Sequence, residues 1–141
     1  MMMPVGILID NVLYNLGPAD LIHAAFSTIA AHLEPENWGI RFPILLGELY
    51  AGTLDARNAD AAIMEIRQIR KELSAIPPEY AIWDIKDIQH YIPNGPQVWK
   101  NAPNLAEFFR SHMGISLLDE LEQDLEVLKR EGGTARLLNI K

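Results

Sequence analysis

The sequence contains no cysteine, which excludes disulfide bonds, catalytic thiolates and zinc sites built on cysteine. It also lacks an apolar run of the roughly 18 residues that a membrane-spanning helix needs. Residues 1–10 have no basic segment, only a very short apolar stretch and no small-residue cleavage site, so we expect no signal peptide. From these absences we expect a cytoplasmic protein that makes no contact with a membrane.

Positive charge is also scarce in this chain. Its 12 Lys and Arg residues face 19 Asp and Glu residues, which gives a net charge of −7 at pH 7. Such a molecule repels phosphate backbones, so nucleic acid is not expected as a partner. A basic protein is the better candidate, because long-range attraction raises association rates without specifying the partner.

The length and composition predict one soluble domain. A chain of 141 residues fits a single domain spanning 1–141, and its hydrophobic content of 49% supplies enough apolar mass for one core. The sequence shows no internal repeat and no low-complexity tract.

The first half of the chain predicts a hairpin followed by three helices. Aliphatic residues 5–9 and strand-favouring residues 12–14 flank the turn pair Asp10-Asn11. Pro18 opens a helix that reaches Leu33 and buries one apolar stripe. The later elements are a loop at 34–42, a short helix at 43–50, and the longest helix, from a cap at Asp55 to Ile76.

The second half predicts less regular structure. Pro77-Pro78 ends the long helix, and the aromatic and branched residues 80–83 predict a buried strand. The later elements are an irregular loop at 89–103, a helical turn at 104–109, a helix whose capping box is Ser116 with Asp119, and a strand at 134–140. Together these elements predict an α+β fold, with about four helices packed on one face of a small, mostly antiparallel sheet.

Asp20, His23 and Ser27 superficially resemble an acid, a base and a nucleophile on one side of the first helix. That side lies opposite the apolar stripe, so we expect it to face water. A serine in water has no desolvated setting and no oxyanion hole. We therefore interpret the three residues as an exposed polar face and predict no catalytic residues.

No metal or cofactor site is expected. The four histidines lack the spacing of a helical zinc pair. Asp84 and Asp87 could hold Mg²⁺, but this spacing more often marks a helix cap and a first-turn acid. The sequence has neither a dinucleotide-binding glycine pattern nor a phosphate-binding loop motif.

Two parts of the sequence are candidate partner surfaces. The last helix carries five acids that we expect on a solvated face, where they could also meet a basic partner: Asp119, Glu120, Glu122, Asp124 and Glu126. Trp38 lies in a polar loop, where its ring must either pack on the core or contact a partner. We expect Arg41 to pair with Glu48 and fix that loop.

Several segments resemble a bacterial polymorphic-toxin immunity family, Immunity protein 70, over roughly residues 7 to 88. They are Phe26 to Ala30, His32 to Pro35, Trp38 to Pro43, Glu48 to Leu54, Ile66-Arg67 through Glu72-Leu73, Pro77-Pro78, and Trp83 to Ile85. The resemblance implies a small α+β protein encoded beside a secreted toxin, which it binds and occludes. Such a protein is an inhibitor and not an enzyme.

The toxin implied by the resemblance is a basic domain, and a nuclease is one candidate. We predict partner contacts by carboxylates and aromatic anchors at Trp38, Arg41, Glu48, Asp84, Asp119, Glu122 and Glu126. Two alternatives stay open. One is a small hydrolase or metal-dependent enzyme, and the other is a structural module that forms homo-oligomers.

Overall fold

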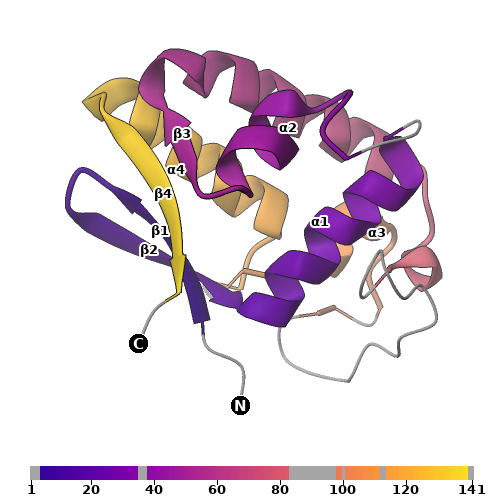
Figure 1. Cartoon of the computed structure of the whole chain (residues 1–141). Helices are drawn as coiled ribbons and strands as arrows, with labels where there is room; N and C mark the ends of the chain where they lie inside the picture. The colour runs from indigo at the N-terminus through magenta and orange to yellow at the C-terminus, as the bar shows by residue number, and fades with distance from the viewer. Residues whose placement is uncertain (1–3, 35–37, 83–97, 100, 112–113, 140–141) are drawn as a thin grey trace.

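A computed structural model describes residues 4–34, 38–82, 98–99, 101–111 and 114–139. Its four strands are β1 (Pro4–Ile9), β2 (Val12–Pro18), β3 (Thr53–Asp55) and β4 (Thr134–Asn139). They form one antiparallel sheet in the order β2-β1-β4-β3. The predicted hairpin and last strand are confirmed, whereas β3 was not predicted (Figure 1).

The hairpin turn follows from its two residues. Asp10 and Asn11 both have positive φ, at 46° and 68°. A two-residue turn with this geometry matches the right-handed twist of the strands that it joins, and Asp and Asn tolerate it better than most residues. Ile9 is therefore directly opposite Val12.

Helices cover one face of the sheet. Ile7, Ile9, Leu54 and Ala135 are almost completely buried on the covered face. Side chains alternate along a strand, so Leu8, which lies opposite Leu13 and Arg136, belongs to the other face and is only half-buried. The predicted α+β class, with helices on one side of an antiparallel sheet, is confirmed.

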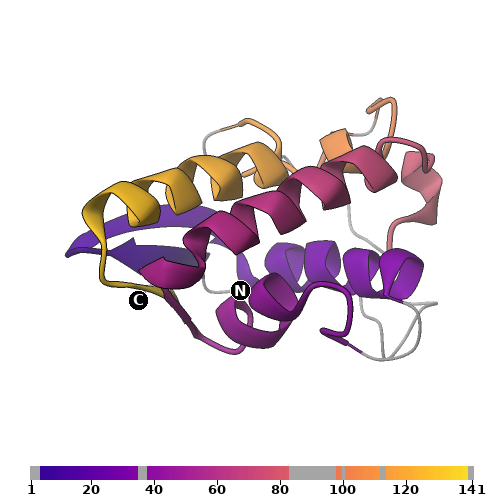
Figure 2. The same cartoon turned by 90° about the horizontal axis from the view of Figure 1, so that it is seen from above.

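The helices are α1 (Ala19–Leu33), α2 (Ala59–Leu73), the single turn α3 (Leu105–Phe108) and α4 (Leu117–Glu131), with the π-helix η1 (Pro43–Leu49) and two 3₁₀ turns, η2 (Ala56–Asn58) and η3 (Pro78–Tyr80). Asp55 caps η2, directly before α2, by accepting the N–H of Arg57. Figure 2 shows α2 and α4 side by side. None of the helices in the described ranges combines the length and apolarity that crossing a membrane requires.

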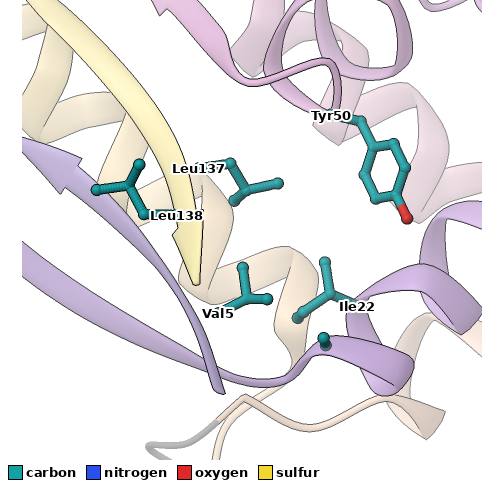
Figure 3. A pocket seen from close by; sticks show the side chains of 6 residues that line it. Val5, Ile22, Tyr50, Leu137 and Leu138 are labelled. Carbon is teal, nitrogen blue, oxygen red and sulfur yellow. The ribbon is translucent and has the colours of Figure 1, made fainter. Parts of the chain in front are cut away.

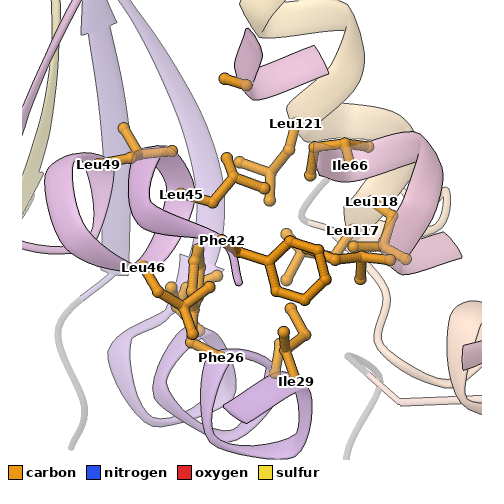
Figure 4. Packing of buried hydrophobic residues seen from close by; sticks show 14 of the residues in the cluster. Phe26, Ile29, Phe42, Leu45, Leu46, Leu49, Ile66, Leu117, Leu118 and Leu121 are labelled. Carbon is orange, nitrogen blue, oxygen red and sulfur yellow. The ribbon is translucent and has the colours of Figure 1, made fainter. Parts of the chain in front are cut away.

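One hydrophobic cluster joins all layers of the fold. Phe42, from the segment before η1, points among side chains of α1, α2 and α4 and is 3% exposed (Figure 4). Phe26 and Ile29 approach from α1, and Leu117 approaches from α4. The segment that carries Phe42 therefore contributes to the core and is not a surface loop.

Three local expectations are wrong. The expected polar face of α1 is only partly exposed, because Ser27 is completely buried while Asp20 and His23 are half-buried. No strand forms in the described residues 80–82, since Tyr80 ends η3 and the backbone N–H of Ile82 donates to Thr28 Oγ1 at 2.9 Å. Ser116 does not cap α4 with its side chain; its hydroxyl donates to the carbonyl of Ala106 at 2.8 Å.

The acidic helix α4 is not fully solvated either. Glu120 is 6% exposed and Asp124 2% exposed, although both were expected on the solvated face. They lie one helical turn apart and share a hydrogen bond, while Asp124 Oδ2 is buried without a partner in the described chain. Burial, together with the hydrogen bond and charge of Glu120, raises the pKa of Asp124 to about 9.

We predict that Asp124→Asn removes a pH-dependent loss of stability. The folded protein holds a proton on Asp124 that the unfolded chain releases above its ordinary pKa of 3.8. The stability contributed by this proton is complete below pH 3.8 and is lost progressively as the pH rises towards the folded pKa. Denaturant unfolding between pH 4 and 9 should therefore show the variant increasingly more stable than the wild type.

The exposed acid Glu126 on the same helix supplies the control. Glu126→Gln should leave the pH dependence of the wild type unchanged. If Asp124→Asn and the wild type show parallel pH profiles, Asp124 is not protonated in the folded state.

Candidate partner-binding site

The segment from residue 38 to residue 50 takes its shape from the carboxylate of Glu34. This side chain accepts the backbone N–H of Gly39 at 2.8 Å, that of Arg41 at 2.6 Å and that of Phe42 at 3.4 Å. Backbone N–H groups in an irregular segment need partners, and one carboxylate here supplies three of them. The loop at the end of α1 is therefore fixed by the side chain of the residue that directly follows this helix.

Arg41 also holds this segment in place, through contacts with α2 and with the end of α1. Its guanidinium forms a bidentate ion pair with Glu72 of α2 and donates to the carbonyl of Leu33 at 3.1 Å. The expected pair with Glu48 is wrong; Glu48 instead accepts a hydrogen bond from the side chain of Asn58 at 3.1 Å. The hydrogen bond from Arg41 lowers the pKa of Glu72 to about 2.

Trp38 packs on the core and also anchors η1. Its indole N–H donates to the carbonyl of Leu46 at 2.8 Å, and the centroid of its ring lies 5.3 Å from the centroid of the Tyr50 ring. The side chain is partly buried against the hydrophobic cluster. The packing role considered for Trp38 is therefore observed, and its contact with a partner stays a prediction.

A second carboxylate holds the start of η1. Glu65 of α2 accepts the N–H of Ile44 at 3.1 Å and the N–H of Leu45 at 2.9 Å. These are orphan donors at a helix N-terminus, where a negative charge is favourable. Burial nevertheless raises the pKa of Glu65, and the nearby charges of Glu34 and Glu48 add to that rise.

Sequence reasoning missed the roles of Glu34, Glu65 and Glu72, although two signals were present. Glu34 is an acid at the C-terminal end of α1, where the helix dipole disfavours negative charge unless another group uses it. Glu65 and Glu72 are seven residues apart, so they lie on one side of α2. Both signals indicate carboxylates used by a neighbouring segment.

The predicted acidic contacts on α4 are ion-paired with α2. Arg70 lies 3.0 Å from Asp119 and 2.6 Å from Glu122, while Arg67 lies 3.3 Å from Glu122 and 4.0 Å from Glu126. Asp119 and Glu126 remain nearly half-exposed, at 46% and 48% of their side chains. They line an open hollow of about 340 Å³ between the two helices.

A serine, a histidine and a tyrosine form a chain of contacts beside α1. Ser27 Oγ lies 3.4 Å from His23 Nε2, and His23 Nδ1 lies 2.5 Å from the hydroxyl of Tyr50. The residue that contacts His23 here is Tyr50, whereas the sequence analysis grouped Asp20 with His23 and Ser27. Because Ser27 is completely buried, its hydroxyl cannot reach a substrate in solution, which does not favour the hydrolase alternative at these three residues.

Tyr50 also borders an open hollow of about 270 Å³ between the sheet and α1 (Figure 3). Val5, Ile22, Leu137 and Leu138 supply most of the described lining. Among the described lining residues, Tyr50 is the one with a titratable side chain, and its hydroxyl is already in contact with His23.

Candidate metal ligands are sparse in the described ranges, which contain no group of three or more His, Asp or Glu side chains able to hold a metal ion. Asp84, Asp87, His90 and His112 lie outside these ranges. The magnesium alternative and the predicted contact at Asp84 therefore stay predictions.

We predict that Glu72→Gln destabilises the protein by about 1 kcal/mol at pH 7, because it removes the charge that Arg41 pairs with. The pKa of Glu72 is lowered in the folded state, so this stability is present above pH 4.5 and is lost as the pH falls towards 2. Thermal or urea unfolding of variant and wild type should converge over that range.

Glu79→Gln is the matched control, since Glu79 is exposed and forms no ion pair with a described residue. It should leave stability almost unchanged at every pH. An equal effect of the two substitutions would show that net charge, and not the Arg41 contact, is responsible.

Comparison with known proteins places this architecture in a family. The family model for Immunity protein 70 matches residues 7–137, which extends the resemblance through α4 and most of β4. No curated protein and no solved structure matches the chain. The match covers the signature segment between Glu34 and Tyr50 and nearly all of the sheet and helices described above. The chain belongs to the Immunity protein 70 family.

Proposed function

We propose that this protein is an immunity protein that binds a cognate bacterial toxin in the cytoplasm and neutralises it by occlusion, without catalysis of its own. The observation that carries the proposal is the family match over residues 7–137. The buried position of Ser27 supports it, because the one serine–histidine contact in the first helix has no access to substrate.

The chemistry of the surface favours a basic toxin domain, of which a nuclease is one candidate. With a net charge of −7, the protein attracts a cationic partner over long range. We propose Glu48, Asp119, Glu122 and Glu126 as carboxylates that contribute to this attraction. Trp38 and Arg41 contribute by keeping the loop between them and η1 in one conformation, which reduces the entropy lost on binding.

The direct test is co-expression with the toxin domain encoded beside this gene. We expect the protein to restore growth of cells that produce the toxin and to co-purify with it as a stable complex. Toxin that remains active and unbound in the presence of a folded excess of this protein would contradict the proposal.

A second prediction concerns the α4 carboxylates. The double variant Asp119→Asn/Glu126→Gln should associate with the toxin ~2- to 5-fold more slowly at low salt, because each exposed charge contributes to steering. The difference should disappear near 0.5 M salt, where the Debye length is only about 4 Å. Stopped-flow or surface-based kinetics measure the rate constant.

Glu79→Gln/Glu131→Gln changes the net charge by the same amount but leaves Asp119 and Glu126 in place; Glu131 is the last residue of α4. If this control slows association as strongly as Asp119→Asn/Glu126→Gln, the net charge steers the toxin and the carboxylates of Asp119 and Glu126 have no special part in it.

A further inference from the structure

The strand β2 forms one edge of the sheet. In the order β2-β1-β4-β3, β2 pairs only with β1 among the described strands. Its seven residues include no Lys, Arg, Asp or Glu. Natural edge strands are commonly protected from further pairing by shortness, charge or a covering segment. The opposite edge shows that protection, since β3 has only three residues and ends on the charged Asp55.

The hairpin turn determines which backbone groups of β2 point outward. In a two-residue hairpin, the residues that flank the turn exchange hydrogen bonds, and the next pair does not. Ile9 and Val12 flank the turn, so Leu8 and Leu13 form the next pair. The N–H and C=O of Leu13 therefore point away from β1, toward the free edge.

Apolar side chains accompany this free backbone. Val12 is 50% exposed and Leu13 44% exposed, and they are consecutive, so they present apolar surface on both faces of the edge. The other large exposed hydrophobic side chains in the described ranges are not adjacent to one another in the sequence. An added strand would pair with the backbone of Leu13 and cover both side chains.

We propose that the toxin supplies an extended segment that adds to the exposed first half of β2, at Val12 and Leu13, as a short fifth strand. The second half of β2 is covered, since Leu16 and Gly17 are buried. This inference rests on the proposed function and names the surface that performs it. Acidic residues lie beyond both ends of the strand, Asp10 before it and Asp20 after it, and neither forms an ion pair with a described residue. An extended segment with apolar residues and basic flanks therefore fits this edge better than a second copy of a chain with a charge of −7.

The variant Leu13→Pro tests the proposal. Proline removes the outward N–H of Leu13 but leaves the hydrogen bonds to β1, and edge strands accept proline where the N–H faces solvent. We expect toxin affinity to fall at least about tenfold, as the loss of edge hydrogen bonds and the blocked approach imply. Leu13→Thr keeps the N–H and the strand propensity, so it should bind much more tightly than Leu13→Pro.

Hydrogen exchange in the unaltered protein tests the same point without a variant. The amide of Leu13 should exchange freely in the free protein and become protected in the toxin complex, whereas the amides of Val12 and Tyr14 are already protected by pairing with β1. Residue-resolved exchange by NMR gives this comparison. It decides the matter even if Leu13→Pro fails to fold.

The outcomes separate the two proposals. A stable toxin complex that leaves the Leu13 amide unprotected overturns strand addition and leaves the immunity function intact. Absence of any complex overturns both. If sedimentation shows a dimer of this chain that Leu13→Pro dissociates, the edge binds a second copy and the toxin is not its occupant.

Discussion

The carboxylates of Glu34 and Glu65 supply, for the segment between residues 39 and 45, the hydrogen bonds that a regular helix or strand would otherwise provide. With its N–H groups satisfied, this segment can insert Phe42 into the core and begin η1 on Pro43. The packing of Phe42 against α1, α2 and α4 depends on this arrangement. The residues of the family signature in this region therefore have a structural role in the fold, whatever contact they make with a partner.

The same use of acids explains much of the negative charge. The carboxylates of Glu34 and Glu65 accept backbone N–H groups, those of α4 pair with the arginines of α2, and burial beside Glu120 raises the pKa of Asp124. Only part of the charge of −7 is thus available on the surface. A basic partner experiences the long-range field of the whole molecule, while short-range recognition needs groups that the fold has not already used. The outward backbone of β2 provides such groups.

Periodicity predicted the elements that bury one continuous stripe: α1, α2, α4 and the hairpin all lie close to the expected positions. It failed where burial comes from several sides. The buried Ser27 and Asp124 lie on faces that an isolated helix would expose, and only tertiary neighbours decide their environment. Likewise, Trp38 and Arg41 were recognised as important to the loop, but their partners Leu46 and Glu72 depend on how η1 and α2 meet. The contacts predicted at Asp84 lie outside the described residues.

The most direct test of the central claim, that the signature segment is held by carboxylates of its own chain, is amide exchange in the free protein and in Glu34→Gln. The account predicts that the amides of Gly39 and Arg41 are protected in the wild type and lose most of that protection in the variant, while those of α4 do not change. Amides at 39 and 41 that already exchange at unprotected rates in the wild type would contradict it.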